Sequence, residues 1–346
     1  MKNRFKMVSF VLLVLFACAA AGFVQQHSDE APAVVSAAGK TPFERFGQLK
    51  VSGSHLVNEK GKAVQLRGIS THGLSWYPQY VNKKAFETLR DQWGIHAVRL
   101  AMYTAEYNGY CTGSAQNRKN LEALIDQAVG FCDDLGLYAV IDWHILSDSD
   151  PNTYKKQSKA FFKKMAQKYA DHKNIIYEIC NEPNGSTTWP QIRSYADTVI
   201  RTIRRYDKKA VIIVGTPTWS QDAAAAAADP VKGSNIMYAF HFYAATHTEE
   251  YRKKLQEAVD AGLAVFVSEF GISEASGNGR IDKSQADQWM KLLERNKISC
   301  IAWNLSNKDE ACAMIDSSCT KTYGWKKSDL SESGRWIYDY MRSAAH

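Results

Sequence analysis

The chain alternates between short apolar runs and longer segments whose apolar residues recur at helical spacing. The short runs are rich in Val, Ile, Phe and Tyr, and their length predicts strands. Since they are apolar almost throughout, they predict strands buried on both faces, as in a parallel sheet. They occupy residues 64–70, 97–103, 138–145, 175–183, 210–217, 236–243, 264–271 and 300–306.

Helical periodicity fills the intervals between these strands, and the stretch 222–229, with six consecutive alanines, is the weakest of the predicted helices. Eight strands alternating with helices predict an α/β fold of the (β/α)8 TIM-barrel type, because a doubly wound sheet usually has fewer strands. The other helices are expected at 84–93, 121–135, 154–170, 189–206, 249–261, 283–296 and 334–345.

A small element precedes the barrel. Residues 49–51 and 55–57 flank Ser52, Gly53 and Ser54, which predicts a short N-terminal β-hairpin that closes the barrel bottom. No linker rich in Pro, Ser or Gly divides the rest of the chain. We therefore expect one catalytic domain over residues 43–346.

Polar and aromatic residues gather where the predicted strands end, and in a barrel these carboxyl ends carry the active site. Taken singly, each has a structural explanation: Arg99 could form a buried ion pair, and a Trp could cap the core. The joint pattern over eight strands favours a site. Its members are His72, Trp76, Tyr77, Arg99, Tyr103, His144, Asn181, Glu182, Trp219, His241, Tyr243, Glu269, Trp303 and Lys308.

Two carboxylates, Glu182 and Glu269, follow the fourth and seventh predicted strands. A facing pair of carboxyl groups suits glycoside hydrolysis, in which one donates a proton and the other attacks the anomeric carbon. Arg99 could keep Glu269 ionised, since a nearby cation favours the charged carboxylate. A separation of roughly 5–5.5 Å would predict retention of configuration, and more than about 6.5 Å inversion.

Several motifs resemble glycoside hydrolase family 5, and in particular its bacterial endoglucanases. They are N-E-P at 181–183, S-E-F-G at 268–271, G-I-S-T-H-G-L-S-W-Y at 68–77, D-W-H-I-L at 142–146, G-T-P-T-W-S-Q-D at 215–222 and W-N-L-S-N-K at 303–308. The resemblance covers residues from about 48 to the C-terminus. It implies a retaining endo-β-1,4-glucanase that acts on cellulose-type chains.

The resemblance also implies roles for individual residues. Glu182 would be the general acid/base and Glu269 the nucleophile, oriented by Arg99 and Tyr243. Asn181 would bond the 2-hydroxyl of the sugar at the cleavage point. The remaining matches would surround the substrate: His144 and His241 around that sugar, Trp303 as its platform, His72, Trp76, Tyr77, Tyr103, Lys308, Ala275, Ser276 and Glu310 on the glycone side, and Trp219 on the leaving-group side.

Charge and motif spacing exclude other classes of function. The formal charge is +7, and without Lys2, Arg4 and Lys6 of the leader 40 basic residues face 36 acidic ones, which is too mild an excess for nucleic acid. No CxxC or HExxH spacing predicts a metal site, and no cofactor is expected. We expect a monomer that needs no protein partner and takes a β-glucan polysaccharide as substrate.

The N-terminus predicts export. Three cationic residues precede an apolar run at 8–16 and small residues at 17–22, typical of a signal peptide over 1–21, with a flexible tether over 22–42. The product would be secreted or periplasmic. Residues 15–18 also resemble a lipoprotein box, which would anchor Cys18 to the outer membrane; ordinary cleavage within 17–21 is the favoured interpretation.

Six cysteines follow Cys18, and export permits disulfides. The predicted strands and helices hold Cys132, Cys180 and Cys300, where buried free thiols are at least as expected as bridges. Cys312 and Cys319 lie in one loop, so they are the predicted disulfide. Cys111 completes the set.

Two alternatives stay open at this point. The same mechanism could act on mannan, mixed-linkage β-glucan or xyloglucan, because the residues at the rim set the choice of polymer. A non-catalytic glycan-binding barrel would have lost a carboxylate or Arg99, and the chain retains all three.

Overall fold

The computed structural model describes residues 39–343. The predicted signal peptide with Cys18, and residues 22–38 of the predicted tether, lie outside the described residues. The first helix, α1 (Pro42–Phe46), begins one residue before the predicted barrel boundary. Thr41 caps it: its hydroxyl accepts from the Glu44 amide, and its own amide donates to the Glu44 carboxylate at 2.7 Å.

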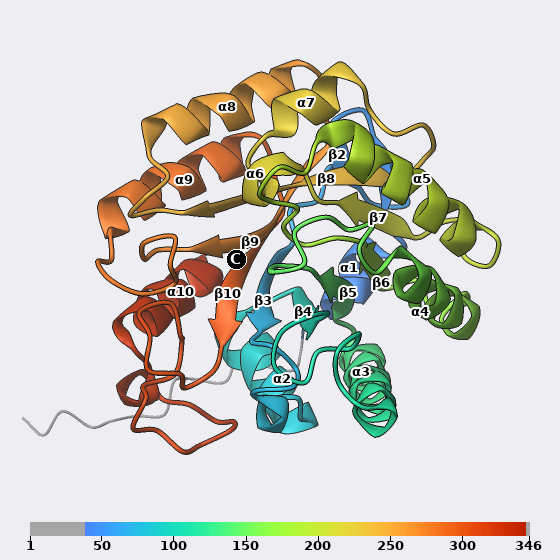
Figure 1. Ribbon diagram of the computed structural model, residues 1–346. Coiled ribbons are helices and arrows are strands. Elements are labelled where there is room, and N and C mark those ends of the chain that lie inside the picture. Colours follow the sequence, from blue (N-terminus) through green and yellow to red (C-terminus); the bar gives the residue numbers. More distant parts are fainter. Residues whose placement is uncertain (1–38, 344–346) are drawn as a thin grey trace, which may run out of the picture. The chain divides into compact units, whose positions relative to one another are not determined.

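Eight parallel strands form a closed barrel, as predicted (Figure 1). They lie in sequence order around the barrel, and β10 closes it against β3 through the pair Cys300 and Arg67. The strands are β3 (Arg67–Thr71), β4 (Ala97–Tyr103), β5 (Tyr138–His144), β6 (Ile175–Glu178), β7 (Val211–Val214), β8 (Ile236–Tyr243), β9 (Val265–Gly271) and β10 (Cys300–Leu305).

The fourth predicted strand is shorter than expected. It ends at Glu178, because the chain then leaves the regular ladder: Ile179 still donates to Ile213 on β7, whereas the Asn181 amide donates to Trp143 on β5. Gly215 permits this path, since a Cβ there would lie 2.1 Å from the Cys180 carbonyl oxygen. Asn181 and Glu182 therefore sit on an irregular segment that follows the strand.

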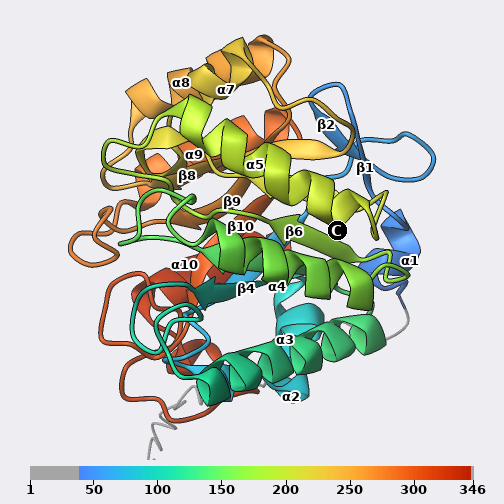
Figure 2. The same cartoon turned by 45° about the vertical axis from the view of Figure 1, so that its right-hand side comes forward.

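The predicted hairpin is present as β1 (Lys50–Ser52) and β2 (His55–Val57), paired antiparallel (Figure 2). Leu49 and Leu56 join the apolar cluster inside the barrel that includes Tyr138, the first residue of β5. The hairpin thus closes the amino-terminal end of the barrel and leaves the carboxyl ends of the strands open for a site.

Helices cover the outside of the barrel and bury a continuous apolar layer against the strands (Figure 1). Helix α3 starts six residues before the predicted start at 121, because Ser114 caps a first stretch that contains almost no apolar residue. The helices and helical turns are η1 (Pro78–Tyr80), α2 (Lys83–Thr88), η2 (Leu89–Trp93), α3 (Ala115–Leu135), α4 (Lys155–Lys168), α5 (Trp189–Arg204), α6 (Pro217–Ser220), α7 (Ala223–Ala228), α8 (Glu249–Asp260), α9 (Lys283–Arg295), η3 (Lys327–Asp329) and α10 (Glu332–Ser343). Across residues 39–343, no helix has the length and apolarity to span a membrane.

The predicted disulfide between Cys312 and Cys319 is wrong. All six cysteines between residues 111 and 319 carry free thiols. The Cys312 thiol points inward, where it donates to Glu310 Oε1 at 3.2 Å and packs near Tyr243 and Trp303. Cys319 instead packs against the outer core. The two side chains therefore belong to different parts of the interior.

Candidate active site

A cleft of about 680 Å³ opens at the carboxyl ends of the strands. It brings together both predicted carboxylates, Tyr243 and every predicted substrate-binding residue. The latter are His72, Trp76, Tyr77, Tyr103, His144, Trp219, Ala275, Ser276, Trp303, Lys308 and Glu310. Three predicted members of the site, Arg99, Asn181 and His241, are buried beneath the cleft and do not line it.

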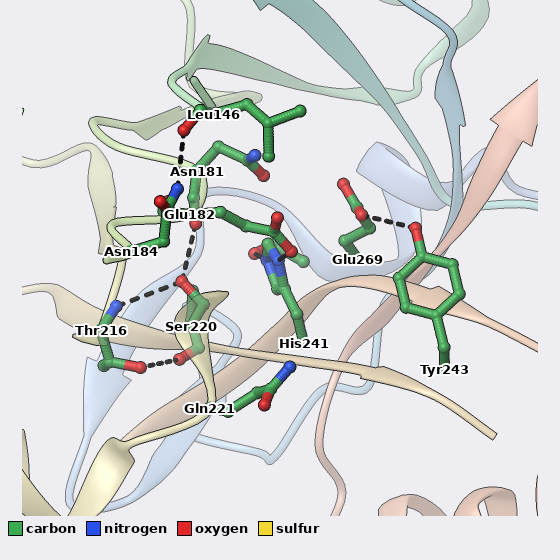
Figure 3. A network of polar contacts seen from close by, with 12 residues as sticks. Leu146, Asn181, Glu182, Asn184, Thr216, Ser220, Gln221, His241, Tyr243 and Glu269 are labelled. Carbon is green, nitrogen blue, oxygen red and sulfur yellow. Dashed lines mark hydrogen bonds and ion pairs between the residues drawn. The ribbon is translucent and has the colours of Figure 1, made fainter. Parts of the chain in front are cut away.

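Glu269 lies on β9 with both carboxylate oxygens engaged. Arg99 Nη1 donates to Oε2 at 3.1 Å. The Tyr243 hydroxyl donates to Oε1 at 2.8 Å (Figure 3). The two donors come from β4 and β8. A carboxylate held from two sides in this way has a fixed orientation toward the cleft and is stabilised as an anion.

Glu182 has a different environment. It is buried, and its only charged hydrogen-bond partner is His241, whose Nδ1 lies 3.0 Å from Oε1. Burial raises the pKa of Glu182; the bond to His241 opposes this, and the charge of Glu269 adds to the rise. Oxygens of the two carboxylates lie within 4.8 Å of one another. Of the two carboxyl groups, Glu182 is therefore the one suited to hold and donate a proton.

His241 is placed between buried acceptors. Ser268 gives its hydroxyl proton to Glu178 at 2.8 Å, so its oxygen must accept from His241 Nε2, which is 2.9 Å away. Nδ1 faces Glu182 Oε1 at 3.0 Å, where a second ring proton would form a hydrogen bond. Burial disfavours the charge, but the carboxylates of Glu178, 3.7 Å from Nε2, and of Glu182, beside Nδ1, raise the pKa of His241 to about 9. His241 is a cation behind Glu182.

This protonation state bears on metal binding. Glu182, His241 and Glu269 could each bring one ligand atom within 4.8 Å of the others, the only such cluster among residues 39–343. A protonated imidazole has no lone pair for a metal ion, however, and Glu269 already receives Arg99 and Tyr243. The donor set fits the proton chemistry of a carboxylate pair better than it fits a metal.

Arg99 lies at the centre of the buried charges and is fully shielded from solvent. Its shortest ion pair is one that the sequence analysis missed: Nε donates to Glu178 Oε2 at 2.7 Å. Burial disfavours the charge of Glu178, but the charge of Arg99, its hydrogen bonds and the nearby His241 ring lower the pKa of Glu178 to about 2. The other partners of Arg99 are Asp142, Asn181, Glu269 and Ser70.

The same guanidinium fixes the amide of Asn181. Nη2 donates to Asn181 Oδ1 at 2.7 Å, which leaves the amide nitrogen to face Ile145 O at 3.0 Å and His144 Nε2 at 3.2 Å. His144 Nδ1 in turn lies 2.6 Å from Asp142. Burial, together with the Arg99 charge, lowers the pKa of His144 to about 3, so this imidazole is neutral.

Aromatic rings line one side of the cleft. The rings of His144 and Trp303 are stacked at 5.3 Å with an interplanar angle of 19°, and Tyr103 contacts His144 at 4.0 Å. Trp76 stands edge-on to Tyr103 at 4.8 Å. Trp76 follows β3, Tyr103 and His144 end β4 and β5, and Trp303 lies within β10. Their rings offer apolar faces of the kind that sugar rings stack on.

The opposite side of the cleft carries Trp219 on an unusual turn. Thr218, Trp219 and Ser220 have φ angles of 58°, 55° and 56°, in the left-handed region, which costs roughly 1–2 kcal/mol for each such residue. Ser220 fixes the turn, because its hydroxyl donates to Asn181 O at 2.7 Å and accepts from the Thr216 amide at 3.2 Å (Figure 3). The Trp219 ring remains 44% exposed at the cleft.

Other members of the site also escaped the sequence analysis. Gln221, His247 and Tyr251 line the cleft beside Trp219, and Glu106 and Leu146 line it elsewhere. Glu178 had a signal: an acidic residue inside an apolar strand must have a buried partner, and Arg99 inside another strand required the same. The loop residues offered none, since exposed polar side chains are common in loops.

Comparison with known proteins agrees with this geometry. The model of the family described as cellulase (glycosyl hydrolase family 5) matches residues 57–309. Endoglucanase A of Butyrivibrio fibrisolvens is 47% identical over 302 residues, 87% of this chain and 70% of that protein. Endoglucanase 5 of Pectobacterium carotovorum is 46% identical over 312 residues, 90% of this chain and 61% of that protein.

Solved structures are similar over most of the chain. The catalytic domain of a Thermobifida fusca endoglucanase is 38% identical with a TM-score of 0.83, over 88% of this chain and all of that domain. A variant of that domain in complex with cellotetraose has a TM-score of 0.81 and 39% identity. By its sequence, its fold and the residues of its cleft, the chain belongs to the cellulase family, glycosyl hydrolase family 5.

Proposed function

We propose that this protein is an endo-β-1,4-glucanase that cleaves cellulose-type glucans with retention of configuration. The observation that carries the proposal is the pair Glu182 and Glu269, whose oxygens lie within 4.8 Å in contrasting environments. Retaining glycosidases hold their carboxyl groups roughly 5–5.5 Å apart, whereas inverting enzymes leave room for a water between them.

In the first step Glu269 attacks the anomeric carbon, and the bond from that carbon to the leaving oxygen breaks. The raised pKa of Glu182 keeps its proton available for that oxygen. Arg99 and Tyr243 hold the attacking carboxylate at 3.1 and 2.8 Å. In the second step Glu182, now ionised beside the cationic His241, takes a proton from the water that releases the sugar.

The order of strands is consistent with cleavage of a glycosidic bond inside the polysaccharide and not at its end. Glu182 follows β6 and Glu269 lies near the end of β9, so the loops after β7 and β8 lie on one side of the pair. Those loops carry Trp219 and, with the start of α8, Tyr251. The rings of Tyr103 and Trp303 lie on the other side. A polysaccharide could thus occupy the cleft on both sides of the carboxylates.

The variants Glu182→Gln and Glu269→Gln test the assignment. Each should lose at least a hundredfold in the hydrolysis of carboxymethylcellulose, since each removes a reacting group. Glu332→Gln is the matched control, because Glu332 forms an exposed surface ion pair with Lys283. Near wild-type activity in either cleft variant would contradict the assignment.

Product analysis tests the stereochemistry and the polymer. Hydrolysis of cello-oligosaccharides followed by NMR should release the β-anomer first, and initial α-anomer would rule out retention. A panel with mannan, mixed-linkage β-glucan and xyloglucan completes the experiment. A preference for one of these over cellulose derivatives would overturn the substrate but not the mechanism.

A further inference from the structure

Besides Glu182 and Glu269, the site contains two buried carboxylates that do not touch the cleft, Asp142 and Glu178. Glu178 is the one that contacts both sides of the catalytic pair. It is 0% exposed, on the last position of β6. Its Oε2 accepts from Arg99 Nε at 2.7 Å, and its Oε1 accepts from the Ser268 hydroxyl at 2.8 Å and from Arg99 Nη2 at 3.3 Å. Glu178 therefore cannot react with a sugar, but it contacts Arg99, which bonds Glu269, and Ser268, which bonds His241.

The first partner leads to Glu269. Arg99 turns one edge of its guanidinium to Glu178, through Nε at 2.7 Å and Nη2 at 3.3 Å, and its Nη1 to Glu269 at 3.1 Å. A planar guanidinium held on one edge presents its remaining donors in a fixed direction. The position of Glu269 thus depends on how Glu178 anchors Arg99.

The second partner leads to Glu182. The Ser268 hydroxyl, bonded to Glu178, accepts from His241 Nε2 at 2.9 Å, and His241 Nδ1 faces Glu182 at 3.0 Å. His241 Nε2 is also only 3.7 Å from Glu178 Oε1. The negative charge of Glu178 favours the protonated ring, and the protonated ring favours Glu182 as an anion once its proton has left.

We propose that Glu178 is a positioning residue for both catalytic carboxylates, setting Glu269 through Arg99 and Glu182 through Ser268 and His241. This inference rests on the proposed glycosidase function. It assigns different consequences to the two arms of contacts that start at Glu178. One arm runs through Ser268 and His241 to Glu182, and the other runs through Arg99 to Glu269. Loss of the Ser268 arm impairs proton donation alone, whereas loss of Glu178 impairs proton donation and nucleophilic attack together.

The Ser268→Ala variant isolates the arm to Glu182. Two substrates are compared by kcat/KM, which reports only the steps up to the glycosyl-enzyme. Cellotetraose needs a proton on its leaving oxygen, whereas 2,4-dinitrophenyl β-cellobioside releases a stable phenolate without one. We expect a loss of roughly 10- to 100-fold on cellotetraose, typical of a misplaced proton donor, and a loss of less than about twofold on the aryl glycoside.

The Glu178→Gln variant, nearly identical in shape, should lose at least about tenfold on both substrates, because Arg99 is released as well. Ser299→Ala is the control for Ser268→Ala. Ser299 is equally buried but bonds the Leu66 amide at the other end of the barrel, so its loss should leave both rates within about twofold. Should Glu178→Gln fail to fold, the Ser268→Ala comparison decides alone.

The outcomes separate the two proposals. A wild-type protein that hydrolyses neither substrate contradicts the proposed function. If the wild type is active, the positioning role is wrong when the kcat/KM of Ser268→Ala falls equally on both substrates or falls on neither. A Glu178→Gln variant with wild-type rates on both substrates overturns it as well and leaves Glu178 as a residue of the fold only.

Discussion

Gly271 lies opposite Tyr243 in the parallel pairing of β8 and β9, and the ring of Tyr243 occupies the space where a side chain at 271 would be. A Cβ there would stand 2.5 Å from the ring. That ring carries the hydroxyl that donates to Glu269. The glycine two positions after Glu269 therefore determines how Tyr243 reaches the proposed nucleophile.

Replacing Gly271 by Ala should lower kcat on cellotetraose by roughly 10- to 100-fold, since the ring must move away from Glu269. The Tyr243→Phe variant should lose a similar amount. In the double variant the losses should not multiply, because both act through one hydrogen bond. Multiplicative losses would show that Gly271 acts by another route.

The charge on His241 predicts how stability changes with pH. Its pKa rises from 6.5 to about 9 on folding, so the protonated ring contributes its full stabilisation below pH 6.5 and loses it as the pH rises through 9. The free energy of unfolding should fall over this window by about 3 kcal/mol, since one pKa unit is worth about 1.4 kcal/mol. Urea unfolding between pH 6 and 10 measures this. An equally steep fall in His241→Asn would contradict it.

The free thiols predict a titration result. A chain carrying Cys18→Ser, denatured without reductant, should expose six thiols to Ellman's reagent, and only four would indicate a disulfide. In the native protein the reaction should be slow. Cys132, Cys180, Cys300 and Cys312 are buried, and burial also raises the pKa of Cys111 to about 12.

The position of Trp219 in the cleft predicts that its ring binds the sugar on the leaving-group side. Its replacement by Ala removes an exposed ring from the cleft, and a lost stacking contact of ~1–2 kcal/mol should raise KM for cellopentaose about tenfold with little change in kcat. Tyr323→Ala is the control, because Tyr323 is similarly exposed but lies outside the cleft. A fall in kcat alone would instead indicate that the turn positions Glu182.

The fold could be predicted because it depends on burial. Strands β4 and β8 begin and end at the predicted residues, since a run buried on both faces has sharp limits. The β6 run does not, because residues 179–183 are as buried as a strand but leave the ladder. The start of α3 was hidden as well, since its first turns depend on the Ser114 cap rather than on an apolar face.

The sequence predicted many of the residues at the cleft, but it did not predict which of them lie buried beneath it. The rim residues, Glu182 and Glu269 are visible from their place at strand ends. Burial of Arg99, Asn181 and His241 beneath the cleft depends on register and on side-chain direction, which the sequence does not display. Glu178 became evident only when the partners of Arg99 could be traced. The choice of Cys312 and Cys319 failed because closeness along a loop does not fix side-chain direction.

The seam at which β10 pairs with β3 has a consequence for synthesis of the protein. Arg99 and Glu178 leave the ribosome long before His241 and Glu269, and β10 must arrive before β3 gains its second neighbour. Until then β3 and β9 each lack one neighbouring strand, and the cleft lacks Trp303. A nascent chain that stops short of β10 therefore yields no partial enzyme, and hydrolysis begins only when the ring of strands is complete.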